Sequence, residues 1–568
     1  MTRPRRIAVL GGGIAGLSAA YTLAKARQTG APIEEFLLEA SDRLGGHLRT
    51  ERVDGYVVEA GPDSFLAEKP EAAALCRELG LGDQLIGSND AERRTYILHH
   101  GRLVPLPDGL MFLVPTRLWP TFWTPLLSFR SKAAIVRDVF KPRPKSRGLE
   151  QASRGSNVAA GFSPAQSESD VAPNTSPALS GSNVPRGLDT ERAGLKPAAT
   201  FGDTFGDTLD SDDVVMDDES VADFVRRHFG DSMLENIADP LLAGVYGGDA
   251  AGLSIRAVLP RFWEMEQKHG SLVRAVLAAR RQRRVAPGPA SSGSGAGRSR
   301  PTTFGQPLPL FMTLRDGLGQ LVEALASRLD PSRIHLGQRV VSLGRGGRAE
   351  LRAVQGQPFP PGEGYVIGCD GGASFAADVV ILALPTYTDG RLLAPVDERL
   401  AQLLGGIPYT AALTVALGYD AAALASLPPG FGFLVPYKEQ RRMLACTFVH
   451  NKFPGRVAPG KGLLRCFLGG ARDSSILDLD DIFIMNVIRS ELHSVINLRA
   501  QPEFHRVYRW PSSMPQYSVG HTQRVKLIQS RVAGIPGVFL AGNAYSGIGI
   551  SDCVRTGRTA AERALAVR

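Results

Sequence analysis

A glycine-rich stretch near the start of the chain, RRIAVLGGGIAGLSAAYTLAKA, constrains the fold more than any other feature. The apolar run at residues 7–10 predicts a buried parallel strand, and residues 14–26 predict the helix that follows it. Between them, Gly11, Gly13 and Gly16 match the pattern G-x-G-x-x-G. Glycines at these positions permit a tight turn, close approach of a pyrophosphate and close packing of helix on strand. The stretch therefore predicts a Rossmann-like α/β domain that binds a dinucleotide at a helix N-terminus.

A second predicted strand, EEFLLEA, carries an acidic residue, Glu39, near its end. In dinucleotide-binding domains an acid at this place accepts hydrogen bonds from the ribose hydroxyls, and its charge disfavours a 2′-phosphate. The glycine pattern on its own is also compatible with a purely structural turn. Together with Glu39 it predicts an adenine dinucleotide, FAD or NAD, and it argues against NADP.

Two further segments distinguish between FAD and NAD. After Glu39 the sequence LGGHLRTERVDGYVVEAGPDSF has a double glycine and a hairpin-like stretch, where a NAD-only domain would continue into a helix. This segment resembles the second phosphate-contacting loop of the flavin amine oxidase and protoporphyrinogen oxidase superfamily. Residues 537–565 predict a strand, a glycine-rich loop and a helix, and in that superfamily this helix points its positive N-terminal end at the flavin. An ordinary βα unit is the alternative for residues 537–565.

Composition narrows the class of protein. The length of 568 residues suggests more than one domain. The net charge of +9 favours acidic ligands and is too small for a nucleic-acid signature. Five scattered cysteines without a CxxC pair indicate reduced thiols. We find no signal-peptide pattern and no apolar run of about 20 residues, so we expect a cytoplasmic protein without a transmembrane helix.

Low-complexity segments divide the chain, and their composition predicts disorder. The predicted organisation is a discontinuous FAD-binding domain, a helical region that acts as substrate lid or faces a membrane, a mixed α+β substrate domain and two disordered insertions. The predicted FAD-binding domain comprises residues 1–92, 304–400 and 500–568, and the predicted helical region comprises residues 93–140 and 214–280. The predicted substrate domain comprises residues 401–499, and the two predicted insertions are residues 141–213 and 281–303.

Five segments outside the insertions carry a more specific resemblance. They read GPDSFLAEKP, LLAGVYGGDAAGLS, GFGFLVPYKEQRRMLACTF, RWPSSMPQYSVGH and GIGISDC. They are similar to the oxygen-dependent porphyrinogen oxidases of haem synthesis, a family that includes protoporphyrinogen IX and bacterial coproporphyrinogen III oxidases. The resemblance implies three two-electron cycles, each passing a hydride from a methylene bridge to flavin N5. Dioxygen would then reoxidise the flavin and yield hydrogen peroxide.

The resemblance also implies which residues contact FAD, without a covalent bond. They are Gly11, Gly12, Gly13, Ile14, Ala15, Gly16, Glu39, Ala40, His47, Gly61, Pro62, Asp63, Ser64, Val340, Trp510, Ile548, Gly549 and Ile550. His47 departs from the family, which usually has Lys or Arg there, and a surface histidine is its alternative role. Trp510 could equally be core packing. No catalytic base and no metal site is nominated.

For the porphyrinogen, we expect an apolar slot with cations for the propionates. The resemblance implies Lys69 as a propionate partner and Gly244 and Tyr246 as pocket lining. Some family members use an arginine at the position of Thr95, and its absence leaves Arg94 as a substitute. The lysine, the missing arginine and the basic charge favour coproporphyrinogen III, which carries four propionates. Protoporphyrinogen IX, with two, is the alternative.

Other functions share the fold. A flavin amine oxidase or a carotenoid-type desaturase has no reason to contain RWPSSMPQY or GVYGGD. A non-enzymatic lipid-binding protein that has lost FAD is opposed by the intact glycine pattern and Glu39. The aromatic segment LVPTRLWPTFWTPLLSF could touch a membrane interface transiently, or pack over the substrate pocket. We therefore expect a porphyrinogen and dioxygen as partners, with no nucleic acid and at most peripheral membrane contact.

Overall fold

Five parallel strands form a sheet around the glycine-rich stretch. They are β1 (Arg5–Leu10), β2 (Ile33–Leu38), β14 (Ile334–His335), β18 (Val379–Leu382) and β24 (Val538–Leu540). Their order is β14-β2-β1-β18-β24, and Val9 of β1 lies between Leu37 and Ile381. Strands buried on both faces are apolar throughout, which is why the run at the start of the chain forms a central strand. The computed structural model describes residues 3–111, 113–141, 218–285, 302–303, 306–346 and 364–567.

Helices cover both faces of this sheet. One set comprises α1 (Ile14–Gln28), α2 (Pro70–Glu78), α11 (Gly319–Ala326) and α18 (Ile550–Ala566). The other comprises α13 (Thr386–Leu393), α14 (Glu398–Gly405) and α17 (His521–Ala533). Side chains alternate along β1, so Ile7 and Val9 pack with the first set while Ala8 and Leu10 pack with the second. The result is a three-layer α/β unit, as expected.

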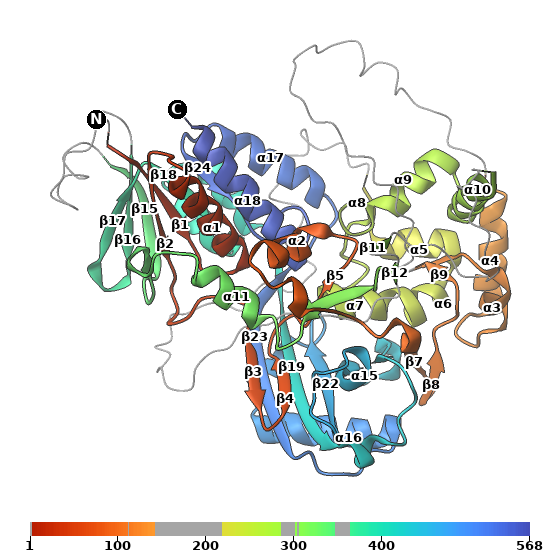
Figure 1. Ribbon diagram of the computed structural model, residues 1–568. Helices are drawn as coiled ribbons and strands as arrows, with labels where there is room; N and C mark the ends of the chain where they lie inside the picture. The colour runs from red at the N-terminus through yellow and green to blue at the C-terminus, as the bar shows by residue number, and fades with distance from the viewer. Residues whose placement is uncertain are drawn as a thin grey trace.

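The first and last helices of the chain lie against each other. A Cβ atom on Gly557 of α18 would lie 2.1 Å from the carbonyl oxygen of Ala15 in α1, so only glycine permits this approach. The sheet and its helices thus combine segments from the beginning, the middle and the end of the chain (Figure 1).

A second, seven-stranded sheet stands beside the first. Its strands are β7 (Thr95–His99), β8 (Arg102–Pro105), β19 (Tyr409–Asp420), β20 (Gly432–Leu434), β21 (Met443–Phe448), β22 (Lys461–Gly469) and β23 (Phe504–Pro515). Their order is β23-β19-β22-β21-β20-β7-β8. Helix α16 (Asp481–Ile496) packs on one face. The sequence-based boundaries placed β7 with the helical region and β23 with the FAD domain, because apolar alternation identifies a strand and does not specify its sheet.

A group of helices lies beside the seven-stranded sheet (Figure 1), and all of them except α3 contribute side chains to a core that they share with it. They are α3 (Leu118–Trp123), α4 (Phe129–Val139), α5 (Val221–Phe229), α6 (Asp231–Met233), α7 (Asp239–Tyr246), α8 (Ile255–Val258), α9 (Pro260–His269) and α10 (Leu272–Val285). The helix α10 ends inside the range 281–303 that was predicted as an insertion. Most of both predicted insertions lies outside the described residues.

The remaining strands form small sheets. They are β3 (Thr50–Val53), β4 (Tyr56–Glu59), β5 (Phe65–Leu66), β6 (Leu85–Gly87), β9 (Leu110–Met111), β10 (Val114–Pro115), β11 (Thr302–Thr303), β12 (Gln306–Pro307), β13 (Phe311–Leu314), β15 (Val340–Gly346), β16 (Gly364–Cys369) and β17 (Ser374–Ala377). A short helix, α15 (Val449–Lys452), connects β21 to β22. The hairpin of β3 and β4 leads the chain from the first sheet to the second.

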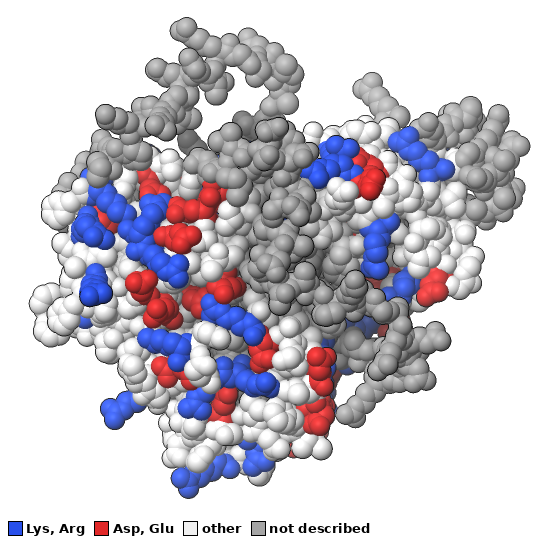
Figure 2. Space-filling view, turned by 180° about the vertical axis from the view of Figure 1, so that it is seen from behind, with Lys and Arg blue, Asp and Glu red and all other residues white. Residues whose placement is uncertain are grey.

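The surface carries charges of both signs. Figure 2 shows basic and acidic side chains interleaved over the visible face, so the positive net charge forms no continuous basic field there. In the described part of the chain, no helix combines the length and the hydropathy that crossing a bilayer would need.

Candidate active site

The glycine-rich turn between β1 and α1 has the shape of an anion-binding site. A Cβ atom on Gly11, whose φ is +105°, would lie 2.6 Å from the carbonyl oxygen of Ala383. One on Gly16 would lie 1.8 Å from the carbonyl oxygen of Gly11. Both positions therefore require glycine for packing. Gly13 differs, because nothing among the described residues lies within 4 Å of its would-be Cβ atom. Gly13 is the N-cap of α1 and brings no side chain to it, which leaves open space beside free N–H groups. Ile14 and Ala15 form the first turn of this helix.

The acidic residue after β2 lies next to this turn. One carboxylate oxygen of Glu39 accepts a hydrogen bond from the N–H of Gly12 at 2.6 Å. The other accepts from the N–H and the hydroxyl of Ser41, each at 2.8 Å. The carbonyl of Glu39 accepts from the N–H of Gln338 at 2.8 Å, which holds the segment leading to Val340 beside it. Ala40 is exposed between them. A carboxylate at this edge fits the ribose of a dinucleotide.

The double glycine lies directly on the first loop. The N–H of Gly45 donates to the carbonyl of Gly12 at 2.8 Å. The ring centre of His47 is 5.7 Å from that of Trp510 in an edge-to-face arrangement. Burial, helped by the neighbouring Arg43, lowers the pKa of His47 to about 4, so the ring is neutral at physiological pH. A charged Lys or Arg, which is usual at this position in the resembling family, is thus replaced by an uncharged aromatic ring.

The loop from Ala60 to Ser64 is fixed to the seven-stranded sheet. The carbonyl of Ala60 accepts from the indole N–H of Trp510 at 3.2 Å and from the hydroxyl of Thr414 at 2.9 Å. The guanidinium of Arg465 donates to the carbonyl of Gly61. Trp510 is fully buried. Its contacts hold this loop in place, which is the core-packing role, and its contact with FAD stays a prediction.

Lys69 meets an acidic residue that sequence analysis did not nominate. Its Nζ lies 2.7 Å from Oδ2 of Asp552 in the first turn of α18, and this oxygen also accepts from the N–H of Gly549 at 3.3 Å. The side chain of Lys69 is 41% exposed and that of Asp552 only 7%. The sequence signal was present, because an acid three residues after a helix N-cap is a common capping position. Ile550 is buried at the start of this helix, next to Ile548 and Gly549.

Two tyrosines complete the group around Asp552. The ring centres of Tyr246, at the end of α7, and Tyr517 are 6.0 Å apart. Burial first, and the charge of Asp552 second, raises the pKa of Tyr246, so its hydroxyl stays protonated. The N–H of Gly547 donates to the hydroxyl of Tyr517 at 2.8 Å. Gly244 is buried in the last turn of α7. The structure thus brings Lys69, Tyr246 and the start of α18 together.

Arg94 stands apart from this group. It precedes β7, near the opposite edge of the seven-stranded sheet from the β23 strand of Trp510. Its side chain is exposed, and its carbonyl accepts from the N–H of Phe431 at 2.8 Å. Within the described ranges, no hydrogen bond or ion pair joins Arg94 to Lys69 or Asp552. Its predicted substrate role stays a prediction.

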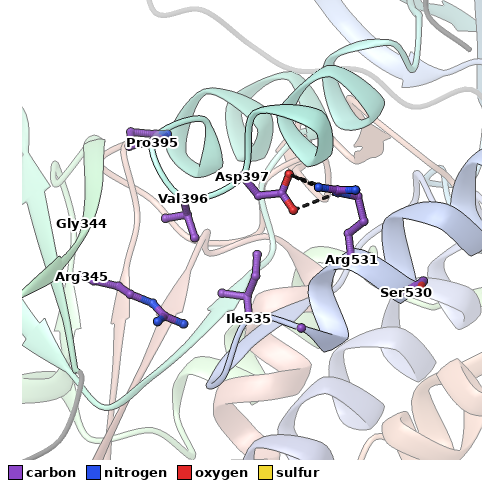
Figure 3. Close-up of a pocket in the computed structure, with 9 residues that line it drawn as sticks. Gly344, Arg345, Pro395, Val396, Asp397, Ser530, Arg531 and Ile535 are labelled. Carbon is purple, nitrogen blue, oxygen red and sulfur yellow. Dashed lines mark hydrogen bonds and ion pairs between the residues drawn. The ribbon is translucent and has the colours of Figure 1, made fainter. Parts of the chain in front are cut away.

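A large surface hollow lies elsewhere in the molecule. It measures about 740 Å³, and Figure 3 shows the ion pair of Arg531 with Asp397 on its wall, with Arg345 on the other side. Its lining comes from β15, from the connection of α13 to α14 and from the end of α17. None of these lining residues belongs to the predicted cofactor or substrate set, so size alone does not make this hollow the active site.

The glycine turn, the acid after β2 and the terminal helix have the arrangement of a dinucleotide-binding domain. Residues 14–565 match the family model described as "Flavin containing amine oxidoreductase", and the chain belongs to this family. It is therefore a flavin enzyme, as the second glycine loop predicted.

Similar proteins refine this assignment. A coproporphyrinogen III oxidase of Bacillus subtilis (strain 168) is 30% identical, over 99% of this chain and 98% of the relative. A chloroplastic protoporphyrinogen oxidase 1 of Spinacia oleracea is 26% identical over 96% of this chain and 81% of the relative. A solved structure of a proposed protoporphyrinogen oxidase from Exiguobacterium sp. 255-15 has a TM-score of 0.71 and 26% identity, and covers 100% of this chain and 99% of its own. These matches confirm the predicted resemblance to porphyrinogen oxidases.

Proposed function

We propose that this chain oxidises coproporphyrinogen III to coproporphyrin III in haem synthesis, with non-covalent FAD as cofactor. The six-electron reaction consumes three molecules of dioxygen and releases three of hydrogen peroxide. The observation that carries the proposal is the meeting of Lys69, Tyr246 and the N-terminal end of α18 around Asp552. A half-exposed cation beside aromatic side chains suits a macrocycle with carboxylate arms.

The residues present fit FAD. The open space at Gly13 and the free N–H groups of α1 suit the pyrophosphate, and Glu39 suits the ribose of the adenosine half. When bound, the flavin supplies a two-electron acceptor that dioxygen can regenerate. We assign its remaining contacts to Val340, to the Gly61–Ser64 loop and to Ile548–Ile550.

The chain's own residues bind and orient the porphyrinogen. Lys69 pairs with a propionate at the exposed side of its ammonium, while Asp552 holds the other side. The half-buried ring of Tyr246 supplies an apolar contact for the macrocycle, and the buried Tyr517, whose ring is inclined by 60° to it, packs behind it. The positive N-terminal end of α18 would stabilise negative charge that develops beside it during the reaction. Fixing the orientation of one bridge carbon is then the main contribution of the protein.

The choice between the two porphyrinogens rests on carboxylates. Coproporphyrinogen III offers four propionates, and protoporphyrinogen IX offers two. The relatives named coproporphyrinogen III oxidase include those from Bacillus subtilis and from Staphylococcus aureus, the latter 24% identical over 99% of both chains. Protoporphyrinogen IX remains the competing substrate, since the chloroplastic relatives are named for it.

A cofactor and product assay tests the reaction class. The purified protein should be yellow, release FAD on denaturation and form a fluorescent porphyrin from a porphyrinogen with hydrogen peroxide in a three-to-one ratio. FAD that stays attached to the polypeptide after denaturation would contradict non-covalent binding. A flavin-loaded protein that oxidises neither porphyrinogen would contradict the reaction.

We also propose that the enzyme is cytoplasmic and binds a membrane surface peripherally through α3 and α4. Trp119 is 74% exposed, Trp123 is 73% exposed and Phe129 is 90% exposed. Arg130 and Arg137 are exposed on the same α4 helix. Solvent-exposed aromatic rings interspersed with cations suit the interface of an anionic bilayer.

A vesicle flotation assay tests this surface. The protein should float with vesicles that contain phosphatidylglycerol, and less with phosphatidylcholine alone. The double variant Trp119→Ser, Trp123→Ser should lose flotation while it retains FAD, whereas Tyr437→Ser, an exposed aromatic of the seven-stranded sheet region, should not. Equal flotation of all three proteins would contradict the proposed surface.

A further inference from the structure

Five ionisable side chains are buried beneath the loop that carries Gly61. They are Glu59, Asp63, Lys452, Arg456 and Arg465, and we call them the buried charge cluster. Each is less than a tenth exposed. Glu59 is the last residue of β4, and Asp63 lies in the loop after it. Lys452 ends α15, Arg456 lies between α15 and β22, and Arg465 belongs to β22.

Short contacts join the cluster to the loop. Nζ of Lys452 lies 3.0 Å from Oδ2 of Asp63. Nη1 of Arg456 lies 2.9 Å from Oε1 of Glu59. Arg465 donates to the backbone carbonyls just before Asp63, at 3.2 Å for Ala60 and more closely for Gly61. The charges therefore contact the loop itself.

With all five groups ionised, the cluster carries one excess positive charge; burial lowers the pKa of Lys452 and of Arg465, and the charge of Asp63 opposes this in both. Three cations face two carboxylates. Burial by itself raises the pKa of Asp63, yet Lys452 and Arg465 outweigh it and hold that pKa below its ordinary value, so the carboxylate is ionised. Aromatic rings surround the lysine, with the ring centres of Phe311 and Phe453 at 4.6 and 5.0 Å from Nζ.

Bulk water does not screen this charge. The cavity that Glu59, Asp63, Arg456 and Arg465 line together with apolar side chains is about 10 Å³, at the lower limit for one water molecule. Nε of Arg456 is buried and has no hydrogen-bond partner among the described residues. A charge in such a low-dielectric environment acts over a longer distance than one at the surface.

Stability alone does not account for the cluster. Buried ion pairs are often no better for stability than apolar side chains of similar volume, because desolvation offsets their attraction. The charged side chains also exert an electrostatic effect on a ligand bound next to them. Whether this effect stabilises or destabilises the ligand depends on the sign of the cluster's net charge. A positive field stabilises any ligand that gains negative charge.

We propose that the buried charge cluster raises the reduction potential of the bound flavin by stabilising the charge that FAD gains on reduction. This inference rests on the proposed function, in which the Gly61–Ser64 loop contacts FAD. Lys452 and Asp63 act as positioning and tuning residues through the loop and the field, and they do not react with the substrate.

The test measures the midpoint potential of bound FAD against a reference dye under anaerobic reduction. Lys452→Met should lower the potential, and Asp63→Asn should raise it, each by about tenfold in the equilibrium ratio of reduced to oxidised flavin, or about 30 mV for a two-electron couple. The double variant removes one charge of each sign, so it should lie close to the wild type. A purely structural role would not produce shifts of opposite sign.

Exposed charges provide matched controls. Lys461 lies on the same β22 strand and pairs with Glu503 at 2.7 Å, with 31% of its side chain exposed. Lys461→Met and Glu503→Gln should leave the potential unchanged, because solvent screens them. If Lys452→Met no longer binds FAD, the direction of the shift in Asp63→Asn tests the inference by itself. If neither variant binds FAD, Glu59→Gln takes their place, because it keeps the Lys452–Asp63 pair, and it should raise the potential.

The outcomes separate the two proposals. A wild-type protein that binds no FAD would refute the proposed function. A flavin-loaded protein whose buried variants keep the wild-type potential, or shift it in the same direction, would refute only the inference on the cluster.

Discussion

At the scale of single residues, the ion pair of Lys69 with Asp552 makes the substrate site testable. Lys69→Ala should raise KM for coproporphyrinogen III by roughly tenfold, because the bond between the partly exposed Lys69 ammonium and a propionate of the substrate is lost. The bound FAD and its absorbance spectrum should not change. Steady-state kinetics and flavin content measure both quantities.

Lys25→Ala is the matched control for Lys69. Lys25 forms a similar ion pair, 2.8 Å from Glu78, on α1 outside the site. It should leave KM unchanged. Equal KM values for both variants and the wild type would make Lys69 an ordinary surface lysine.

His47 gives a prediction on pH. A histidine with an ordinary pKa near 6.5 gains a proton between pH 8 and pH 5.5, whereas the pKa of about 4 keeps His47 neutral over this interval. The affinity of the apoprotein for FAD should therefore follow the same pH profile in the wild type and in His47→Gln. Titration by flavin fluorescence measures it. A weakening of FAD binding near pH 6.5 in the wild type that His47→Gln abolishes would contradict a neutral ring.

At the scale of elements, the contact of α1 with α18 couples the two ends of the chain to the cofactor site. Gly557→Ala places a methyl group 2.1 Å from the carbonyl of Ala15, so the helices must separate. We expect a lower Tm and weaker FAD binding, because α1 carries the glycine turn. Thermal unfolding and FAD titration measure these effects.

Gly405→Ala is the control for this substitution. Gly405 is exposed in α14, and no described atom lies within 4 Å of its would-be Cβ atom. The methyl group should leave Tm unchanged or raise it slightly, because alanine favours the helix. If Gly557→Ala were as harmless, the close approach of α1 and α18 would not constrain the site.

Local patterns predicted the elements of this fold well, and long-range pairings poorly. The apolar run, the glycine pattern and Glu39 lie within one βαβ unit, so their spacing alone predicts their geometry. Lys69 and Asp552 are separated by 483 positions, and no local pattern links them. For the same reason the sequence did not indicate that β23 leaves the FAD domain for the other sheet. The predicted FAD and porphyrinogen contacts remain predictions until a bound structure or variant data test them.

At the scale of the whole molecule, a buried network links α4, α5 and α9, and we expect it to affect stability in acid. Both ring nitrogens of His228 face carboxylates, Asp138 at 2.5 Å and Glu266 at 3.0 Å. Burial raises the pKa of Glu266, but hydrogen bonds from Arg227 and His228 outweigh it, and the result is about 2.

The sign of the pH effect follows from this lowered pKa. An unfolded Glu has a pKa near 4.3, so Glu266 contributes its full stability above about pH 4.3 and loses it as the pH falls toward 2. Glu266→Gln should therefore lower Tm at pH 7, and the difference from the wild type should shrink as the pH approaches 3. A difference in Tm that is constant between pH 7 and pH 3 would contradict this account.

The central claim is that the flavin site acts on a porphyrinogen with four propionates. The measurement that tests it most directly is kcat/KM of the FAD-loaded enzyme for coproporphyrinogen III and for protoporphyrinogen IX under the same conditions. We predict a higher kcat/KM for coproporphyrinogen III, and a smaller difference between the two substrates in Lys69→Ala. A clearly higher kcat/KM for protoporphyrinogen IX in the wild type would contradict the claim.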